Sequence, residues 1–180
     1  DFARVPDGPC VVVANEFLDA LPVRQILRCA DGWRERRVGF DGARFVFVPG
    51  PVLVDPPPEA VREDAPPGAV VELPVAALGM VDALAHRARH AATVALFVDY
   101  GPLASGVGDT LQAVSGHAAA DPLDRPGAVD LTAHVDFAAI ARAARQAGLR
   151  VWGPVPQGVF LARLGLHARA AMLTKTASPA

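Results

Sequence analysis

Two runs of apolar residues, each ended abruptly by polar residues, constrain the fold more than any other feature. Val11–Ala14 leads into Asn15 and Glu16, and Val94–Val98 leads into Asp99. Uninterrupted apolar runs of this kind, the first of them β-branched at Val11, Val12 and Val13, are typical of strands that a parallel sheet buries on both faces. Ligands of open α/β sheets bind beyond the carboxyl ends of such strands. The two runs therefore predict an α/β fold with acidic groups at its ligand-binding edge.

The composition is that of a globular protein and argues against several partners. With 180 residues, 52% apolar and 20% charged, the chain 1–180 is expected to form a single domain with a sizeable core. A net charge of −2 without a basic stripe gives no reason to expect nucleic acid or an anionic membrane as partner. No apolar run approaches the roughly 20 residues of a membrane span, and the N-terminal residues lack the layout of a signal peptide. Cys10 and Cys29 lie in apolar, strand-like segments, so we expect buried free thiols and a reducing, intracellular compartment.

Residues 23–50 carry a different pattern, in which extended segments alternate with tight-turn signals. The segments are residues 23–29, 33–40 and 43–48, and Asp-Gly pairs at 31–32 and 41–42 separate them. Asp-Gly between alternating segments is a strong hairpin signal, so we expect a three-stranded antiparallel β-meander. Residues 51–68 are rich in proline and acidic residues, which predicts a solvated, semi-rigid loop.

Helices and strands alternate in the rest of the chain, as in a doubly wound sheet. Asp136 and Gly148 stand where the cap residues of a helix over 137–147 would stand. The stretch 101–127 is predicted to be irregular, and loops of this length tend to be functional. The other predicted elements are helices at 73–90, 159–164 and 167–173, a strand at 149–155 and a frayed tail at 174–180.

Glu16 and Asp19 form the first candidate site, three residues apart in the turn after the first apolar run. One interpretation is that they cap or solvate this turn, which is the common role of such acids. The other is that two carboxylates at a strand end hold a cationic guanidinium or amine through charge-assisted hydrogen bonds. The position at the ligand-binding edge favours the second. Asp99 and Tyr100, at the end of the neighbouring strand, would complete one acidic rim.

A third group of polar residues lies in the long loop and beyond it. It comprises His117, Asp121, Asp130, His134 and Asp136. Their spacing matches no compact zinc-ligand motif, and Asp136 is explained as a helix cap. We therefore expect no metal site in this chain.

Three other patterns are assigned no chemistry. His86 and His90 share a predicted helix face, but the segment lacks the acidic residue of a zincin motif, and an exposed helix face explains them. Residues 101–108 are rich in glycine without the lysine of a P-loop. Ser105 and Ser115 lack the context of a nucleophile elbow. The residues alone lead to an α/β sheet with an acidic rim, but not to a reaction.

Several blocks of the sequence, in order, resemble the MidA family of S-adenosylmethionine-dependent methyltransferases. This family includes the mitochondrial complex I assembly factor that acts on an arginine of a subunit. The resemblance runs from Val11 to about Leu173. The blocks are ANEFLDALPVRQ, GWRERRV, FVDYG, GDTLQAVSGH with ADPL, PGAVDLTAHVDF and PVPQGVFLARLGLHAR.

The resemblance implies a class I methyltransferase, with a Rossmann-like sheet in which residues 11–14 and 94–98 would be the fourth and fifth strands and residues 23–50 an inserted meander. S-adenosylmethionine would be the cofactor and a protein arginine the substrate. Glu16 and Asp19 would then pin the guanidinium. The substrate side would further include Asn15, Asp99, Tyr100, His117, Asp130 and His134. The cofactor-binding loop is not expected in this chain, and Asn15 is the chain's one candidate for a cofactor contact.

Departures from the family pattern give a second set of expectations. The glycine-rich cofactor loop and the ribose-binding acid would lie upstream of this chain, and Glu72-Leu73-Pro74 replaces a common helix entry. We therefore expect the C-terminal half of an enzyme, with the first strands of the sheet lacking. That half alone would be inactive and would bind the cofactor weakly. The alternative is a non-catalytic assembly or binding module. The partner would be an arginine-bearing protein such as a complex I subunit, in the bacterial cytoplasm or, in a eukaryote, the mitochondrial matrix.

Overall fold

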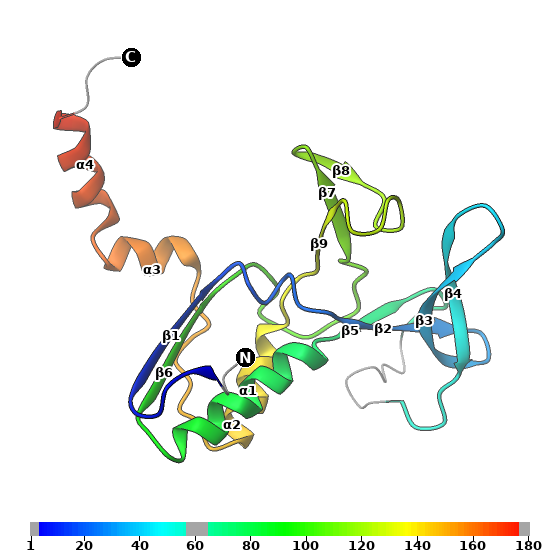
Figure 1. The fold of residues 1–180 in the computed structure, drawn as a ribbon, viewed down its shortest axis with the longest axis horizontal. Coiled ribbons are helices and arrows are strands. Elements are labelled where there is room, and N and C mark those ends of the chain that lie inside the picture. Colours follow the sequence, from blue (N-terminus) through cyan, green and yellow to red (C-terminus); the bar gives the residue numbers. More distant parts are fainter. Residues whose placement is uncertain (1–3, 57–64, 177–180) are drawn as a thin grey trace.

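The computed structural model describes residues 4–56 and 65–176 of the chain. These residues form a parallel pair of strands, two antiparallel sheets and four helices (Figure 1). The predicted α/β class is confirmed. Among the described residues, no helix is both long enough and apolar enough to cross a membrane.

The two apolar runs pair as predicted and position the candidate site. Strand β1 (Cys10–Asn15) runs parallel to β6 (Thr93–Val98), with Asn15 opposite Val98. Both strands therefore end at the same level, and the loops that follow them lie side by side.

Helices α1 (Val75–Ala88) and α2 (Phe137–Gln146) cover one face of this pair (Figure 1). The core between them is built from small and branched side chains, because α1 and α2 pack closely against each other. Its buried members are Leu18, Ala77, Val81, Val135, Ile140 and Ala144. Asp136 accepts a hydrogen bond from the backbone N–H of Ala139 (2.8 Å), and Gly148 follows α2 with φ 84°. The predicted caps of this helix are confirmed.

The prediction that β1 is buried on both faces is wrong for the described residues. Val11 and Val13 are 75% and 66% exposed, and Val94 and Leu96 on β6 are exposed beside them. The described helices cover only one face, so side chains alternate between a covered and an open face along each strand.

The predicted β-meander is confirmed and is larger than expected. Its strands are β2 (Arg24–Cys29), β3 (Gly32–Phe40) and β4 (Phe45–Val52), and β5 (Val70–Leu73) pairs antiparallel with β2. Ile26, Trp33 and Val71 form the centre of a second core.

Two boundaries around the meander differ from the prediction. Glu72 and Leu73, predicted near or within the first helix, lie in β5 because they pair with Gln25 and Arg24, and the helix begins only after Pro74. Residues 51 and 52 of the predicted loop belong to β4. Residues 57–64 of that loop lie outside the described part of the chain.

The stretch 101–127, predicted to be irregular, contains most of a small antiparallel sheet. Strands β7 (Gln112–Ser115) and β8 (Ala118–Ala120) form a hairpin, and β9 (Asp130–Thr132) pairs with the other side of β7. The hairpin turn places Gly116 and His117 at φ 57° and 62°. Positive φ at both central residues is typical of a type I′ turn, but here the turn lacks the usual Asn-Gly or Asp-Gly signal.

The C-terminal part departs from prediction in two places. Residues 149–155 do not form a strand, because no described strand lies beside them to form a ladder, although Leu149 and Val151 pack on the first core. Helices α3 (Gln157–Arg163) and α4 (Leu166–Thr176) confirm the two short helices. Residues 174–176 are helical and not frayed; residues 177–180 lie outside the described part.

The two cysteines are free, as predicted, but each is half-buried and not buried. Each lies at one end of a strand, Cys10 at the start of β1 and Cys29 at the end of β2.

Candidate functional site

Glu16, the residue that follows β1, has an unusual backbone. Its φ is 45°, in the left-handed region, and its N–H donates to the carbonyl of Val98 at 2.9 Å. A non-glycine residue in this region carries a backbone strain of about 1–3 kcal/mol, and such strain gathers at functional sites. The side chain is exposed. The loop therefore presents an exposed carboxylate from a fixed backbone position.

The carboxylate of Asp99 holds the backbone of this loop in place. Its Oδ2 accepts hydrogen bonds from three successive backbone N–H groups, those of Phe17 (3.2 Å), Leu18 (2.9 Å) and Asp19 (3.3 Å). Its Oδ1 accepts from the N–H of Tyr100 at 2.9 Å. Both carboxylate oxygens of Asp99 thus accept backbone hydrogen bonds. Asp99 was predicted to be part of the acidic rim, and it supports the loop that carries Glu16 and Asp19.

Asp19 lies in a different environment from Glu16. It is only 6% exposed, and its backbone carbonyl accepts from the N–H of Ala133 at 2.9 Å. Its Oδ1 has no hydrogen-bond partner among the described residues. A buried, unpaired carboxylate oxygen is costly and calls for a donor. The loop therefore combines one exposed acid with one buried acid that has a free acceptor.

Tyr100 lies beside the acids Asp19 and Asp99 and contacts the neighbouring segment. Burial raises the pKa of its phenol, and the carboxylates of Asp19 and Asp99 raise it further, while Thr132 acts in the opposite direction. Its ring meets that of His134 edge to face, with centroids 5.7 Å apart and planes at 87°. The phenol is therefore neutral at physiological pH. The Tyr100 phenol and the His134 imidazole lie side by side next to the loop that carries Asp19.

The segment that carries His134 is fixed on both sides. The N–H of Val135 donates to the carbonyl of Tyr100 at 3.0 Å, and a Cβ on Gly101 would lie 2.0 Å from the Val135 carbonyl oxygen. Only glycine allows this close approach. The N–H of His134 donates to the hydroxyl of Thr110 at 2.9 Å.

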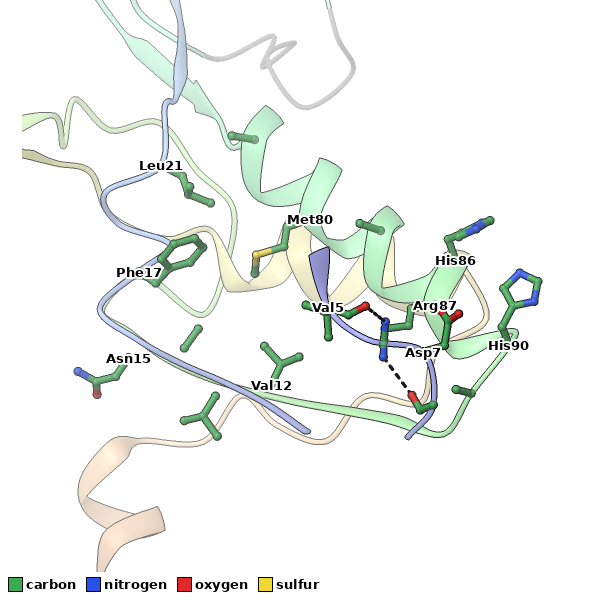
Figure 2. Close-up of a pocket in the computed structure, with 16 residues that line it drawn as sticks. Val5, Asp7, Val12, Asn15, Phe17, Leu21, Met80, His86, Arg87 and His90 are labelled. Carbon is green, nitrogen blue, oxygen red and sulfur yellow. Dashed lines mark hydrogen bonds between the residues drawn. The ribbon is translucent and has the colours of Figure 1, made fainter. Parts of the chain in front are cut away.

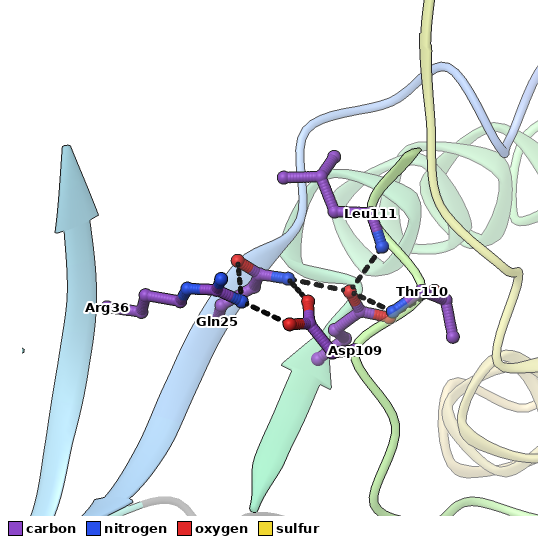
Figure 3. A network of polar contacts seen from close by, with 6 residues as sticks. Gln25, Arg36, Asp109, Thr110 and Leu111 are labelled. Carbon is purple, nitrogen blue, oxygen red and sulfur yellow. Dashed lines mark hydrogen bonds and ion pairs between the residues drawn. The ribbon is translucent and has the colours of Figure 1, made fainter. Parts of the chain in front are cut away.

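Thr110 belongs to a polar network that the sequence did not reveal (Figure 3). At its centre, Glu72 Oε1 accepts from Gln25 Nε2 (2.8 Å) and from the N–H groups of Thr110 and Leu111 (3.1 Å each). The Thr110 hydroxyl donates to the other oxygen of Glu72. No signal in the sequence indicated this network, because Glu72 was predicted near the start of a helix and its partner Thr110 lies 38 positions farther along the chain.

Asp109 extends this network to the meander. It accepts from Gln25 Nε2 at 3.0 Å and from Arg36 Nη1 at 2.6 Å (Figure 3). The guanidinium of Arg36 stacks on Phe47, 3.8 Å from the ring centroid. Hydrogen bonds thus run from the meander through Glu72 and Thr110 to His134.

His117 and Asp130 lie farther out. His117 is exposed at the β7–β8 turn, and Asp130 is exposed in β9, opposite Val114. The hairpin stands beyond the carboxyl ends of β1 and β6 (Figure 1). No bond from either side chain to the Glu16 loop occurs among the described residues, so their place at the site stays a prediction.

The remaining acids of the third group have structural roles. Asp121 accepts from the N–H of Leu123 at 2.8 Å, and Asp136 caps α2 and accepts from the Ser105 hydroxyl at 2.9 Å. Over residues 4–56 and 65–176, no group of three or more histidine, cysteine or acidic side chains is arranged to hold a metal ion.

An open groove of about 1380 Å³ lies between β1, α1 and the N-terminal segment. Asn15 and Phe17 line it near the candidate loop, whereas the exposed His86 and His90 line its far end, with ring centroids 5.1 Å apart (Figure 2). Arg87 fixes the N-terminal segment there by donating to the carbonyl of Gly8 at 3.0 Å. Asn15, the last residue of β1, is therefore accessible from this groove.

Comparisons with known proteins connect this geometry to a family. A family model described as "Putative S-adenosyl-L-methionine-dependent methyltransferase" matches residues 1–155. Curated relatives include the mitochondrial protein arginine methyltransferase NDUFAF7 of Xenopus tropicalis, 34% identical over 99% of this chain and 41% of the relative, and that of Homo sapiens, 34% identical over 96% and 39%. The Drosophila melanogaster homolog is 35% identical over 97% of this chain and 41% of its own length.

Two solved structures from Burkholderia thailandensis have the same fold. One, of an uncharacterized protein, has a TM-score of 0.81 and 37% identity, covering 94% of this chain and 47% of the other. The second, bound to S-adenosyl-homocysteine, has a TM-score of 0.78 and 35% identity, covering 94% and 46%. The chain thus spans about two fifths of the length of the curated relatives that it matches.

Proposed function

The chain belongs to this family of S-adenosyl-L-methionine-dependent methyltransferases, and we propose that it forms the substrate side of an enzyme that methylates a protein arginine. The observation that carries the proposal is the loop after β1, where exposed Glu16 adjoins buried Asp19 with its free carboxylate oxygen. Relatives named protein arginine methyltransferases support the enzyme over a non-catalytic binding module.

The architecture that we propose is part of a class I methyltransferase sheet. In this interpretation β1 and β6 are its fourth and fifth strands, and the meander of β2 to β5 is an insertion between them. The parallel pairing of β1 and β6 and the likeness to a structure bound to S-adenosyl-homocysteine support it.

The residues at the end of β1 fit one side of a cofactor site. S-adenosylmethionine carries a cationic sulfonium and supplies an electrophilic methyl group when bound. Acidic groups and the amide of Asn15, which lines the groove, are compatible with such a charge. We assign Asn15 to the cofactor side, with further contacts supplied outside this chain.

Glu16 and Asp19 would act on the guanidinium. Arginine stays protonated near neutrality, so a carboxylate can accept its N–H groups and aim one nitrogen at the methyl carbon. Glu16 is exposed and would take the proton that the nitrogen loses as the new N–C bond forms and the methyl–sulfur bond of the cofactor breaks, leaving a neutral thioether. The free Oδ1 of Asp19 would accept from the same cation and relieve its own missing hydrogen bond.

Other residues would shape the substrate channel. Tyr100 and His134 form one wall through their edge-to-face contact, and Asp99 supports the loop. We place His117 and Asp130 along the outer path of the substrate, on the hairpin side. A complex I subunit is the target that we propose, in the mitochondrial matrix for a eukaryotic source and in the cytoplasm for a bacterial one.

The test uses the full-length protein with radiolabelled S-adenosylmethionine and lysate from cells that lack its gene. Acid hydrolysis of the labelled proteins should release methylarginine. Glu16→Gln should reduce the transfer by about 100-fold or more, because the guanidinium loses its exposed partner. Its thermal midpoint should stay that of the wild type.

Asp55→Asn is the matched control, since Asp55 is an exposed acid of the loop after β4. It should transfer methyl groups at the wild-type rate. Label found only in methylated lysine or in no amino acid would reject the arginine substrate, and full activity of Glu16→Gln would reject its role.

A further inference from the structure

One side chain, that of Asp99, supports three successive residues of the Glu16 loop. The three N–H groups of Phe17, Leu18 and Asp19 converge on Oδ2 of Asp99 within 3.3 Å. Three donors in succession form a concave backbone nest, which binds an anion. Here the anion belongs to the protein itself, 82 residues farther along the chain at its first contact.

This nest holds the residues that directly follow Glu16. The backbone of Glu16 is held on one side by the Val98 carbonyl and on the other by the Asp99 carboxylate, through the next residue. The strained φ of 45° persists only while the surroundings enforce it. Charge-assisted hydrogen bonds to a carboxylate are stronger than neutral ones and suit this task.

We propose that Asp99 is the positioning residue of the reaction: it fixes the Glu16 loop in its strained conformation and thereby aims the Glu16 carboxylate at the substrate guanidinium. The inference rests on the proposed function for the role of Glu16. It replaces the expectation that Asp99 itself binds substrate, because both of its oxygens already receive backbone donors.

The test compares Asp99→Asn and Asp99→Glu in the full-length protein. Asparagine keeps the size but removes the charge, and glutamate keeps the charge but moves it by one methylene. Both should lower kcat by about 10–100-fold, because a small displacement of an aligned group has effects of this size. KM for S-adenosylmethionine should change less than about twofold, because Asp99 accepts from the loop and from the N–H of Tyr100, and neither is placed at the cofactor.

Asp41→Asn is the matched control. Asp41 also accepts two backbone N–H groups, those of Ala43 (2.9 Å) and Arg44 (3.0 Å), but in the β3–β4 turn. It should leave both kcat and KM unchanged. If it lowers kcat as much as Asp99→Asn, a general loss of loop capping explains the effect and the inference fails.

Combining variants separates positioning from plain stability. Because Asp99 acts through the Glu16 carboxylate, it has nothing left to position once that carboxylate is removed. The double variant Glu16→Gln with Asp99→Asn should therefore be no slower than Glu16→Gln alone. Multiplying effects would overturn the inference while leaving the role of Glu16 intact.

An activity-independent measurement completes the test. Amide hydrogen exchange at residues 17–19 should accelerate at least about tenfold in Asp99→Asn and Asp99→Glu, with exchange in α1 and α2 unchanged. Unchanged exchange at residues 17–19 in both variants would overturn the inference. If Glu16→Gln is fully active while this exchange accelerates, the proposed function fails and the loop support stands.

Discussion

The phenol of Tyr100 lies against the buried acid of the candidate loop, and its ionisation reports on that acid. Burial and the carboxylates of Asp19 and Asp99 all disfavour the phenolate. The folded protein therefore holds the phenolic proton more tightly than the unfolded chain does. Stability from this group is complete below the unfolded pKa of about 10 and is lost as pH rises through the raised folded value.

Asp19→Asn should lower the pKa of Tyr100 toward its ordinary value, because a negative neighbour is removed. The measurement is the phenolate absorbance during an alkaline titration, with the titration of Tyr100→Phe subtracted so that only Tyr100 contributes. Asp124→Asn, which removes an exposed acid paired with Arg125, is the control and should leave the curve in place. An unchanged curve for Asp19→Asn would contradict the proximity of the two groups.

At the scale of elements, the hydrogen-bond network of Glu72 joins the β-meander, through Thr110, to the segment that carries His134. Glu72 lies in β5 and accepts from the side chain of Gln25 in β2 and from backbone and hydroxyl donors of Thr110. Each oxygen of the carboxylate faces donors. An amide in its place could still accept from the N–H groups at one oxygen and donate to the Thr110 hydroxyl, but every hydrogen bond that this side chain makes would lose its charge assistance.

Glu72→Gln should therefore lower the free energy of unfolding by about 1–2 kcal/mol, the difference between charged and neutral hydrogen bonds. Urea denaturation followed by circular dichroism measures this change. Glu35→Gln is the matched control, because Glu35 pairs with the partly exposed guanidinium groups of Arg24 and Arg37. Its change should stay below about 1 kcal/mol. Equal losses for both variants would show that the Glu72 network stabilises the fold no more than the partly exposed ion pairs of Glu35 do.

Elements with strong local signals could be predicted from the sequence, and the others could not. The apolar runs, the Asp-Gly turns and the Asp136 cap each act within a few residues. Strand β5 has four residues and owes its conformation to pairing with β2, more than forty positions away. Residues 149–155 have strand-like composition, yet no described strand pairs with them.

The candidate site shows the same division between local signals and long-range contacts. Glu16 could be placed because it follows a strand. The support by Asp99, the burial of Asp19 and the network of Glu72 could not be predicted, since each depends on contacts between distant segments.

At the scale of the whole molecule, the open face of β1 and β6 is the largest departure from expectation. Val11, Val13, Val94 and Leu96 form an apolar surface on this face. Exposed apolar patches on strands favour association with other chains. We therefore expect the isolated 180-residue chain to self-associate at micromolar concentration.

Val13→Lys should shift the isolated chain toward monomer, because a charge on this face would be desolvated by association. Sedimentation velocity over a range of concentrations measures the effect. Val54→Lys alters a similarly exposed valine in the loop after β4 and should leave the association unchanged. A monomeric wild-type chain, or equal effects of the two variants, would contradict the expectation.

The register of β1 and β6 has a consequence for how the sequence can change. Asn15 stands opposite Val98, so Glu16 reaches the Val98 carbonyl and Asp99 lies beneath the loop. Because side chains alternate between faces, inserting or deleting one residue in either strand would turn Asp99 away from the loop. Two segments 82 residues apart must therefore keep their lengths matched, and only paired insertions or deletions would preserve the loop.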